Sequence, residues 1–154
     1  MYAMDTWGVL FSRLPISLPR GIPLTRPPWP EYGLLLAEAA ASRSEDPWHR
    51  VGAVVLRPDH SVAGVGYNGA PAGIEIDWAD KEERLPLVIH AEINALRWAT
   101  PDEVRGGLLI STRQPCPQCL TSIAAYQLAT VFFRDRADDT TALAQRLGLA
   151  MHAI

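Results

Sequence analysis

The chain has 154 residues, of which 48% are hydrophobic and 20% are charged, a composition typical of one globular domain of ordinary size. No apolar run reaches the roughly 18 residues that a membrane span needs, and the first eleven residues lack the basic start of a secretory signal. The net charge of −3 disfavours a nucleic-acid partner, because nucleic-acid readers carry a basic excess. We therefore expect a cytoplasmic protein with no membrane segment.

Residues 1–30 are rich in proline, holding six of the thirteen prolines of the chain. Proline fixes φ and removes a backbone N–H, so this stretch is not expected to form a regular helix or a central strand. We predict an extended N-terminal arm over residues 1–30, followed by a single domain over residues 31–154. Apolar residues between the prolines favour packing of the arm on another surface, with a neighbouring subunit as one candidate.

The rest of the chain alternates strands and helices. Leucine and alanine predict a first helix from Glu31 to Ala41, and two valine-containing runs, 51–56 and 62–67, predict a β-hairpin. A polar loop is expected through residues 68–84. Beyond it, we predict helices over 90–98, 117–128 and 138–147, and strands over 108–112, 131–133 and 149–154. This order predicts a three-layer α/β/α fold with a central mixed sheet of about five strands.

Two short segments hold residues that can bind a metal: His90-Ala91-Glu92 and Pro115-Cys116-Pro117-Gln118-Cys119. In an α/β sheet the helices that begin at these segments start at the same edge, so the segments should meet in one crevice. His90, Cys116 and Cys119 supply three ligands and leave a fourth position for water, as in catalytic zinc sites. A redox Cys-x-x-Cys pair is the alternative, but the preceding His-x-Glu favours metal ligation. We predict one catalytic Zn²⁺ per chain.

Glu92 is expected to carry protons rather than to bind the metal. It would take a proton from the zinc-activated water, give one to a ring nitrogen, and later protonate departing ammonia in a hydrolytic deamination. We expect Cys116 and Cys119 to have lowered thiol pKa values at a helix N-terminus, and to be thiolates even before metal binds. The remaining histidines lack such neighbours and are expected to be ordinary buried, hydrogen-bonded residues: His49, His60 and His152.

From Glu31 onwards the chain resembles the deoxycytidylate (dCMP) deaminases of the cytidine deaminase superfamily. The segments that carry the resemblance are Ser44–Pro47, Val51–Val55, Gly66–Gly73, His90–Ala95 and Pro115–Cys119. The two zinc segments indicate the superfamily. The segment Gly66–Gly73 is the more discriminating one and points to the dCMP branch.

The resemblance implies an enzyme, usually a hexamer, that converts dCMP to dUMP in pyrimidine deoxynucleotide metabolism. It implies that Asn68 bonds the sugar hydroxyl and that the amide of Ala91 bonds the pyrimidine carbonyl. It also implies activation by dCTP and inhibition by dTTP, with an effector loop formed by Gly66, Tyr67, Asn68 and Gly69.

The chain departs from the family pattern at several arginines. Arg50 precedes Val51, Arg113 lies two residues before Pro115, and Arg134-Asp135-Arg136 follows the predicted fourth strand. Because a guanidinium group binds phosphate through its planar fork, Arg113 and Arg134 are candidates for phosphate contacts. An exposed surface position is the alternative for each.

Two other functions stay open at this stage. The alternative within the enzymes is a deaminase that acts on another nucleoside, a nucleobase or a tRNA base, although the acidic net charge disfavours tRNA. The alternative outside the enzymes is a protein that binds nucleotides without catalysing a reaction. The presence of Glu92 together with all three zinc ligands disfavours the second alternative.

Overall fold

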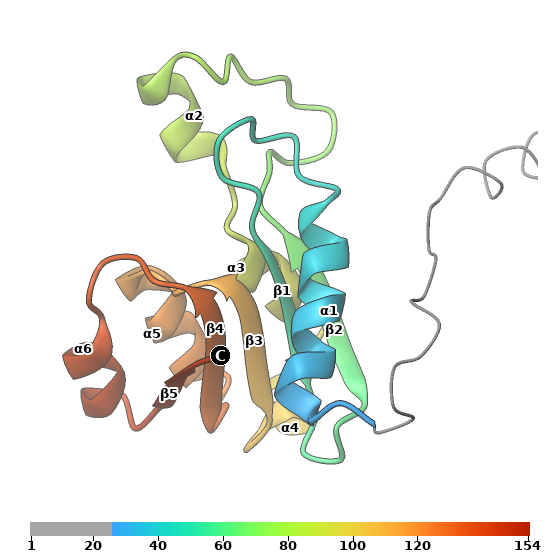
Figure 1. Ribbon diagram of the computed structural model, residues 1–154. Coiled ribbons are helices and arrows are strands. Elements are labelled where there is room, and N and C mark those ends of the chain that lie inside the picture. The colour runs from blue at the N-terminus through green and yellow to red at the C-terminus, as the bar shows by residue number, and fades with distance from the viewer. Residues whose placement is uncertain (1–25) are drawn as a thin grey trace, which may run out of the picture.

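The computed structural model describes residues 26–154, so most of the predicted N-terminal arm, residues 1–25, lies outside the described residues. The described part contains one five-stranded sheet with helices on both faces (Figure 1). The elements in chain order are α1 (Trp29–Ala41), β1 (Gly52–Leu56), β2 (Val62–Tyr67), α2 (Lys81–Leu87), α3 (Ala91–Leu96), α4 (Pro101–Val104), β3 (Leu108–Arg113), α5 (Pro117–Ala125), β4 (Thr130–Asp135), α6 (Thr141–Arg146) and β5 (Ala150–Ala153). This confirms the predicted α/β class.

The sheet has the strand order β2-β1-β3-β4-β5. Strand β1 pairs antiparallel with both β2 and β3, whereas β3, β4 and β5 run parallel to one another. The sheet is therefore mixed, as predicted. The parallel strands are joined by α5 and α6, which return the chain to the same end of the sheet before each strand starts.

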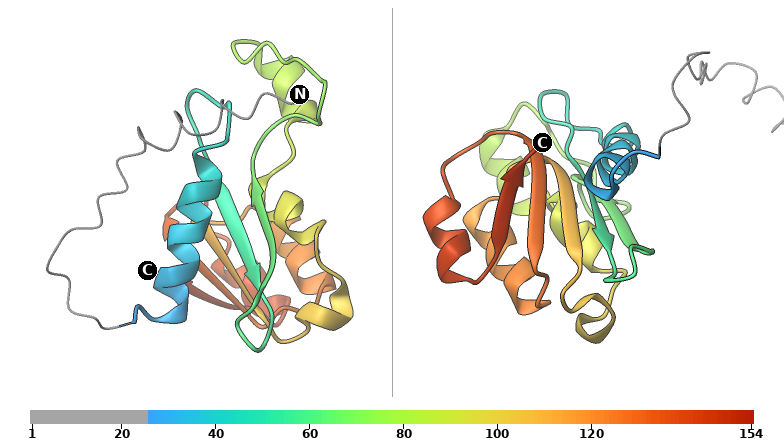
Figure 2. Two further views of the ribbon diagram at one scale, coloured as in Figure 1. Left: turned by 90° about the vertical axis from the view of Figure 1, so that its right-hand side faces the viewer. Right: turned by 60° about the horizontal axis from the view of Figure 1, so that its bottom comes forward.

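Each face of the sheet has its own helical layer. On one face Val54, Leu56 and Ile110 pack against Leu34 and Leu36 of α1, which lies alone on that side in Figure 2. On the other face, the strands pack against α3, α5 and α6. The buried residues of this cluster include Ala53, Val55, Leu109 and Val131 of the strands and Leu120 and Ile123 of α5. Both sides of β1 are thus buried, which accounts for its continuous run of apolar residues.

Two short helices were not predicted. Helix α2 begins inside the polar stretch expected to be a loop and extends three residues beyond it, to Leu87. Its first turn is capped by Asp80, which accepts hydrogen bonds from the N–H groups of Glu82 and Glu83. No residue of α2 is buried, so the segment has no apolar period by which a helix could be recognised. Helix α4 begins with a capping box formed by Thr100 and Glu103.

The predicted elements have shifted ends. The helices expected over 90–98, 117–128 and 138–147 are shorter, and α1 begins at Trp29, two residues before the predicted start. Strand β4 is longer than the predicted strand over 131–133, because it extends through Asp135. Within residues 26–154, no helix has the length and apolar character to cross a membrane.

Candidate metal centre and active site

His90, Cys116 and Cys119 meet at the N-termini of two helices. His90 occupies the position just before the first residue of α3, Cys116 occupies the same position at α5, and Cys119 lies in the first turn of α5. Their ligand atoms all lie within 4.8 Å of one another. The predicted crevice at the helix starts therefore exists, and it holds all three proposed ligands.

The spacing of these atoms fits a zinc ion. The Nδ1 atom of His90 lies 3.5 Å from the Sγ of Cys116 and 3.3 Å from the Sγ of Cys119. Zinc bonds of about 2.3 Å to sulfur and about 2.05 Å to nitrogen, at a tetrahedral angle, separate the two atoms by about 3.6 Å. Two sulfurs and one imidazole nitrogen are also the donor types that zinc prefers.

Glu92 lies beside this cluster without joining it. The residue is 4% exposed, and its Oε2 lies 3.6 Å from the Sγ of Cys119. Burial raises the pKa of Glu92, while its own backbone N–H and the neighbouring His90 act in the opposite direction. A buried carboxyl with a raised pKa takes up a proton more readily than an exposed one, as a proton carrier must.

The expectation that both thiols ionise before metal binds is wrong for Cys119. Burial raises the pKa of this thiol well above its usual value, and the nearby Glu92 and Cys116 raise it further. The helix N-terminus does not offset the loss of water and the adjacent carboxylate. We therefore expect Cys119 to lose its proton as the metal binds.

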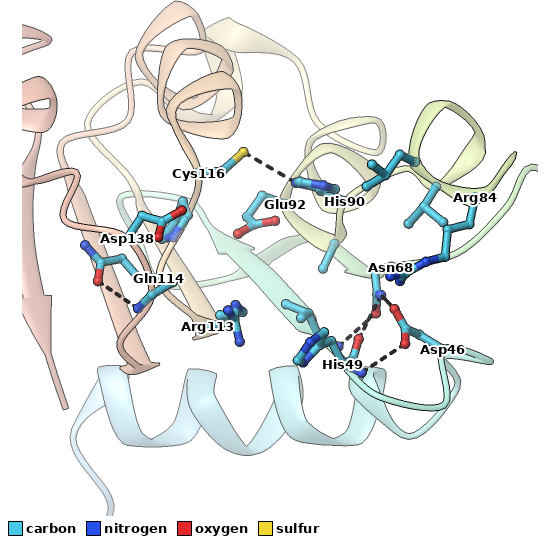
Figure 3. A pocket seen from close by; sticks show the side chains of 16 residues that line it. Asp46, His49, Asn68, Arg84, His90, Glu92, Arg113, Gln114, Cys116 and Asp138 are labelled. Carbon is cyan, nitrogen blue, oxygen red and sulfur yellow. Dashed lines mark hydrogen bonds between the residues drawn. The ribbon is translucent and has the colours of Figure 1, made fainter. Parts of the chain in front are cut away.

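A pocket of about 250 Å³ opens over these groups. Figure 3 shows Glu92 and His90 in its centre, with Asn68 and Arg84 on one side and Gln114 and Asp138 on the other. Its lining also includes residues that the sequence did not single out as site residues: Asp46, His49, Arg84, Gln114 and Asp138. Asp46 lies within the segment Ser44–Pro47, which carries part of the family resemblance, and His49 follows that segment.

Comparison with known proteins identifies the family. Residues 27–134, more than half of the chain, match the cytidine and deoxycytidylate deaminase zinc-binding region. The chain belongs to the cytidine and deoxycytidylate deaminase family. The resemblance found in the motifs is thereby confirmed.

Relatives of this deaminase include named deoxycytidylate deaminases. The enzyme of Mycobacterium phage D29 is 37% identical over 126 residues, which cover 71% of this chain and 97% of the relative. The human enzyme is 34% identical over 113 residues, covering 68% of this chain and 64% of the relative. Among solved structures, the apo dCMP deaminase of cyanophage S-TIM5 matches with a TM-score of 0.70 and 28% identity, covering 84% of this chain and all of that one. The same phage enzyme in complex with dCMP and dUMP matches with a TM-score of 0.62 and 25% identity, covering 82% and 93%.

Asn68 of the deaminase lines the pocket, but most of its amide is already used. Its side-chain oxygen accepts from the N–H of Val51 at 2.8 Å, and its nitrogen donates to the carbonyl of His49 at 2.9 Å and to Asp46 at 3.3 Å. An amide oxygen has two lone pairs. One acceptor position is therefore left for a ligand.

The two arginines predicted to contact phosphate lie in different places. Arg113, the last residue of β3, lines the pocket. Arg134 does not line it and instead pairs with Glu38 of α1 and, at 2.9 Å, with Asp135. The structure therefore places only Arg113 where a substrate could meet it.

The predicted effector loop has a packing role at its first residue. A side chain on Gly66 would place its Cβ 2.3 Å from the backbone nitrogen of Ala95, so β2 and α3 approach closely only because this residue is glycine. Tyr67 is 36% exposed, and Gly69 pairs with Ile89 through two backbone hydrogen bonds. Of the loop, Asn68 is the residue that lines the pocket.

The expectation for the other three histidines is wrong, because none of them is buried. His49 is exposed and lines the pocket. His60 stacks on Trp29, and His152 stacks on Phe132. The sequence around a single histidine does not predict these surroundings. They depend on the loop or the sheet face on which the histidine lies in the folded chain.

Proposed function

We propose that this protein is a zinc-dependent deaminase that converts dCMP to dUMP and ammonia in pyrimidine deoxynucleotide metabolism. The observation that carries the proposal is the cluster of His90, Cys116 and Cys119 with Glu92 buried beside it. The choice of dCMP is supported by the names of the relatives and by the phage structure that contains dCMP and dUMP.

His90, Cys116 and Cys119 would hold the zinc ion, with Cys119 buried and Cys116 half-buried. When bound, zinc would supply a Lewis acid that activates a water molecule for attack. The chain itself holds the imidazole so that Nδ1 faces both sulfurs. A metal held by these three residues would lie near the carboxyl of Glu92, whose Oε2 is 3.6 Å from the Sγ of Cys119.

Glu92 would move the protons of the reaction. Its carboxylate accepts a proton from the attacking water as the new C–O bond forms at the ring carbon, and passes that proton to the adjacent ring nitrogen. It then takes up the second proton of the former water and gives it to the amino group as the C–N bond breaks. Ammonia leaves, and the ring carbon becomes a carbonyl.

Three further residues would contact the substrate. Ala91 is the first residue of α3, where a backbone N–H has no partner within the helix, so its amide can donate to the pyrimidine carbonyl. Asn68 keeps one acceptor position for the donor hydrogen of a sugar hydroxyl. Arg113 lines the same pocket and offers a cationic fork for the phosphate.

A substrate panel tests the proposal. Ammonia release would be measured with dCMP, CMP, deoxycytidine, cytosine, guanine and a tRNA anticodon stem-loop. We expect the highest kcat/KM with dCMP. A higher value with a nucleoside, a free base or the tRNA would replace the proposed substrate, and nucleotide binding without ammonia release from any of them would point to the non-catalytic alternative.

Assembly, regulation and location complete the proposal. We propose a homo-oligomer, supported by the exposed apolar side chains of Trp29, Tyr32 and Leu35 on α1, and a hexamer by the family resemblance. We also propose activation by dCTP and inhibition by dTTP through the loop Gly66–Gly69. A cytoplasmic location is supported by two cysteines that form no disulfide. Sedimentation analysis and assays with each nucleotide test the first two points.

A further inference from the structure

Arg84 lines the pocket from a helix that the sequence did not predict. It lies in the middle of α2, which Figure 1 shows projecting from the domain beyond the chain segment that joins α1 to β1. The guanidinium carbon of Arg84 lies 5.0 Å from the ring centroid of Trp48, a residue of that joining segment. A cation within about 6 Å of an indole ring is attracted to it, so Trp48 braces the arginine.

The guanidinium of Arg84 has unused capacity to bind an acceptor. Its Nε is buried and has no hydrogen-bond partner among residues 26–154. A buried donor left without a partner costs about 1–3 kcal/mol. In the same part of the chain, three arginines have a carboxylate oxygen within 3.2 Å: Arg57, Arg105 and Arg134. Arg84 forms no such ion pair with these residues of the chain.

Each side of the pocket has a carboxylate, Asp46 beside Asn68 and Arg84, and Asp138 opposite them (Figure 3). The carboxylate of Asp46 already accepts hydrogen bonds from the N–H groups of Trp48 and His49 and from the amide of Asn68. The other arginine of the pocket, Arg113, lies opposite Asp135 in the pairing of β3 with β4, so it has a carboxylate on the neighbouring strand. An anionic group of a ligand therefore finds the less compensated cation at Arg84.

We propose that Arg84, braced by Trp48, binds the 5′-phosphate of the substrate and makes this enzyme select nucleoside monophosphates over nucleosides. This rests on the proposed function, because it takes the base to lie at Glu92 and the sugar at Asn68. With those two ends placed, the phosphate lies on the Arg84 side of the pocket. Arg113 then has a secondary role in holding the phosphate.

The test compares two ligands that differ only in the phosphate. Calorimetry would measure the affinity of the zinc-loaded protein for dUMP and for deoxyuridine, in the wild type, Arg84→Gln and Arg113→Gln. We expect Arg84→Gln to weaken dUMP binding about 10- to 100-fold, the scale of a lost charge-assisted hydrogen bond, and to change deoxyuridine binding by less than about threefold. Arg113→Gln should weaken dUMP binding less.

Further variants control for charge and for folding. Arg146→Gln removes the same charge from an exposed position on α6, outside the pocket lining, and should leave both affinities unchanged. Arg84→Lys keeps the charge but loses the planar fork, so we expect an intermediate loss for dUMP. Trp48→Ala should weaken dUMP binding several-fold, and Trp48→Phe should restore most of it. Arg84 lies on α2, which buries no residue, and Trp48 and Arg146 are exposed, so these substitutions leave the core intact.

Two results would overturn the proposal: an Arg84→Gln variant with wild-type affinity for dUMP, or one that loses dUMP and deoxyuridine by the same factor. The first would show that Arg84 does not meet the phosphate, and the second that it only maintains the shape of the pocket. Failure of the proposed function is seen separately, as a wild-type protein that releases no ammonia from dCMP.

Discussion

The side-chain oxygen of Asn68 accepts a hydrogen bond from the backbone N–H of Val51 at 2.8 Å. Together with its bonds to His49 and Asp46, this contact ties the segment between α1 and β1 to the end of β2. Two walls of the pocket are therefore held by one amide. A residue proposed to touch the substrate also determines the shape of the site.

Replacing Asn68 should lower stability as well as activity. Asn68→Asp keeps the acceptor but loses both donors, leaves the carbonyl of His49 unpaired, and puts a second carboxylate beside Asp46. We expect the free energy of unfolding to fall by about 1–3 kcal/mol, measured by urea denaturation. Gln145→Glu, an amide-to-acid change at an exposed position of α6, should change it by less than about 0.5 kcal/mol. An unchanged midpoint for Asn68→Asp would contradict a structural role for the amide.

Removing the carboxylate of Glu92 should separate metal binding from turnover. Glu92→Gln is expected to keep about one zinc per chain, because the three ligands are untouched, and to lower kcat for dCMP by at least about 10²- to 10⁴-fold. Metal analysis and ammonia release on the same sample provide the two measurements. Glu82→Gln, on the exposed face of α2, is the matched control and should keep its activity. Activity retained in Glu92→Gln would rule out the proton-carrying role.

The two cysteines should differ in what their loss does to the fold. Cys116→Ser and Cys119→Ser should each release zinc to a chelator far more readily than the wild type, because a hydroxyl replaces a thiolate ligand. Cys119 is 1% exposed, whereas Cys116 is half-buried, so Cys119→Ser should also lower the melting temperature of the metal-free protein. Equal zinc retention in the wild type and both variants would contradict the assignment of the ligands.

Arg134 should matter for stability rather than for substrate binding. Since it pairs with Glu38 and Asp135 at the surface, Arg134→Gln should change kcat/KM for dCMP by less than about threefold and cost at most about 1 kcal/mol. A large rise in KM for dCMP would restore Arg134 as a phosphate contact.

The effect of Arg134→Gln should also depend on pH. The hydrogen bond from Arg134 holds the pKa of Asp135 below its usual value of 3.8. A lowered carboxyl pKa stabilises the fold above the unfolded value, and that contribution is lost as pH falls through the folded value. The difference in melting temperature between the wild type and Arg134→Gln should therefore be present at pH 7 and shrink in acid below about pH 4. A difference that grows in acid would contradict this origin.

The cluster of proposed metal ligands could be predicted from the sequence because the chemistry and spacing of these residues are local. Cys116 and Cys119 are three positions apart at the start of a helix, and His90 precedes another, so the motif itself sets most of the geometry. The alternation of strands and helices could also be predicted, since the three central strands β1, β3 and β4 bury apolar residues. Helix α2 was not, because it is held by the Asp80 cap and buries nothing.

What the sequence by itself determined was the cluster of His90, Cys116 and Cys119 proposed to bind zinc, the carboxyl of Glu92 proposed to carry protons, and the α/β class that brings two helix starts together. Only the tertiary structure decided which arginines meet the pocket. Arg134 is turned toward Glu38 of α1, while Arg84, on an unpredicted helix, stacks on Trp48 and lines the cavity. The physical reason is that a ligand motif and the periodic spacing of apolar residues each involve only a few neighbouring residues in the sequence. The surroundings of a charged group instead depend on segments that packing brings together from distant parts of the chain.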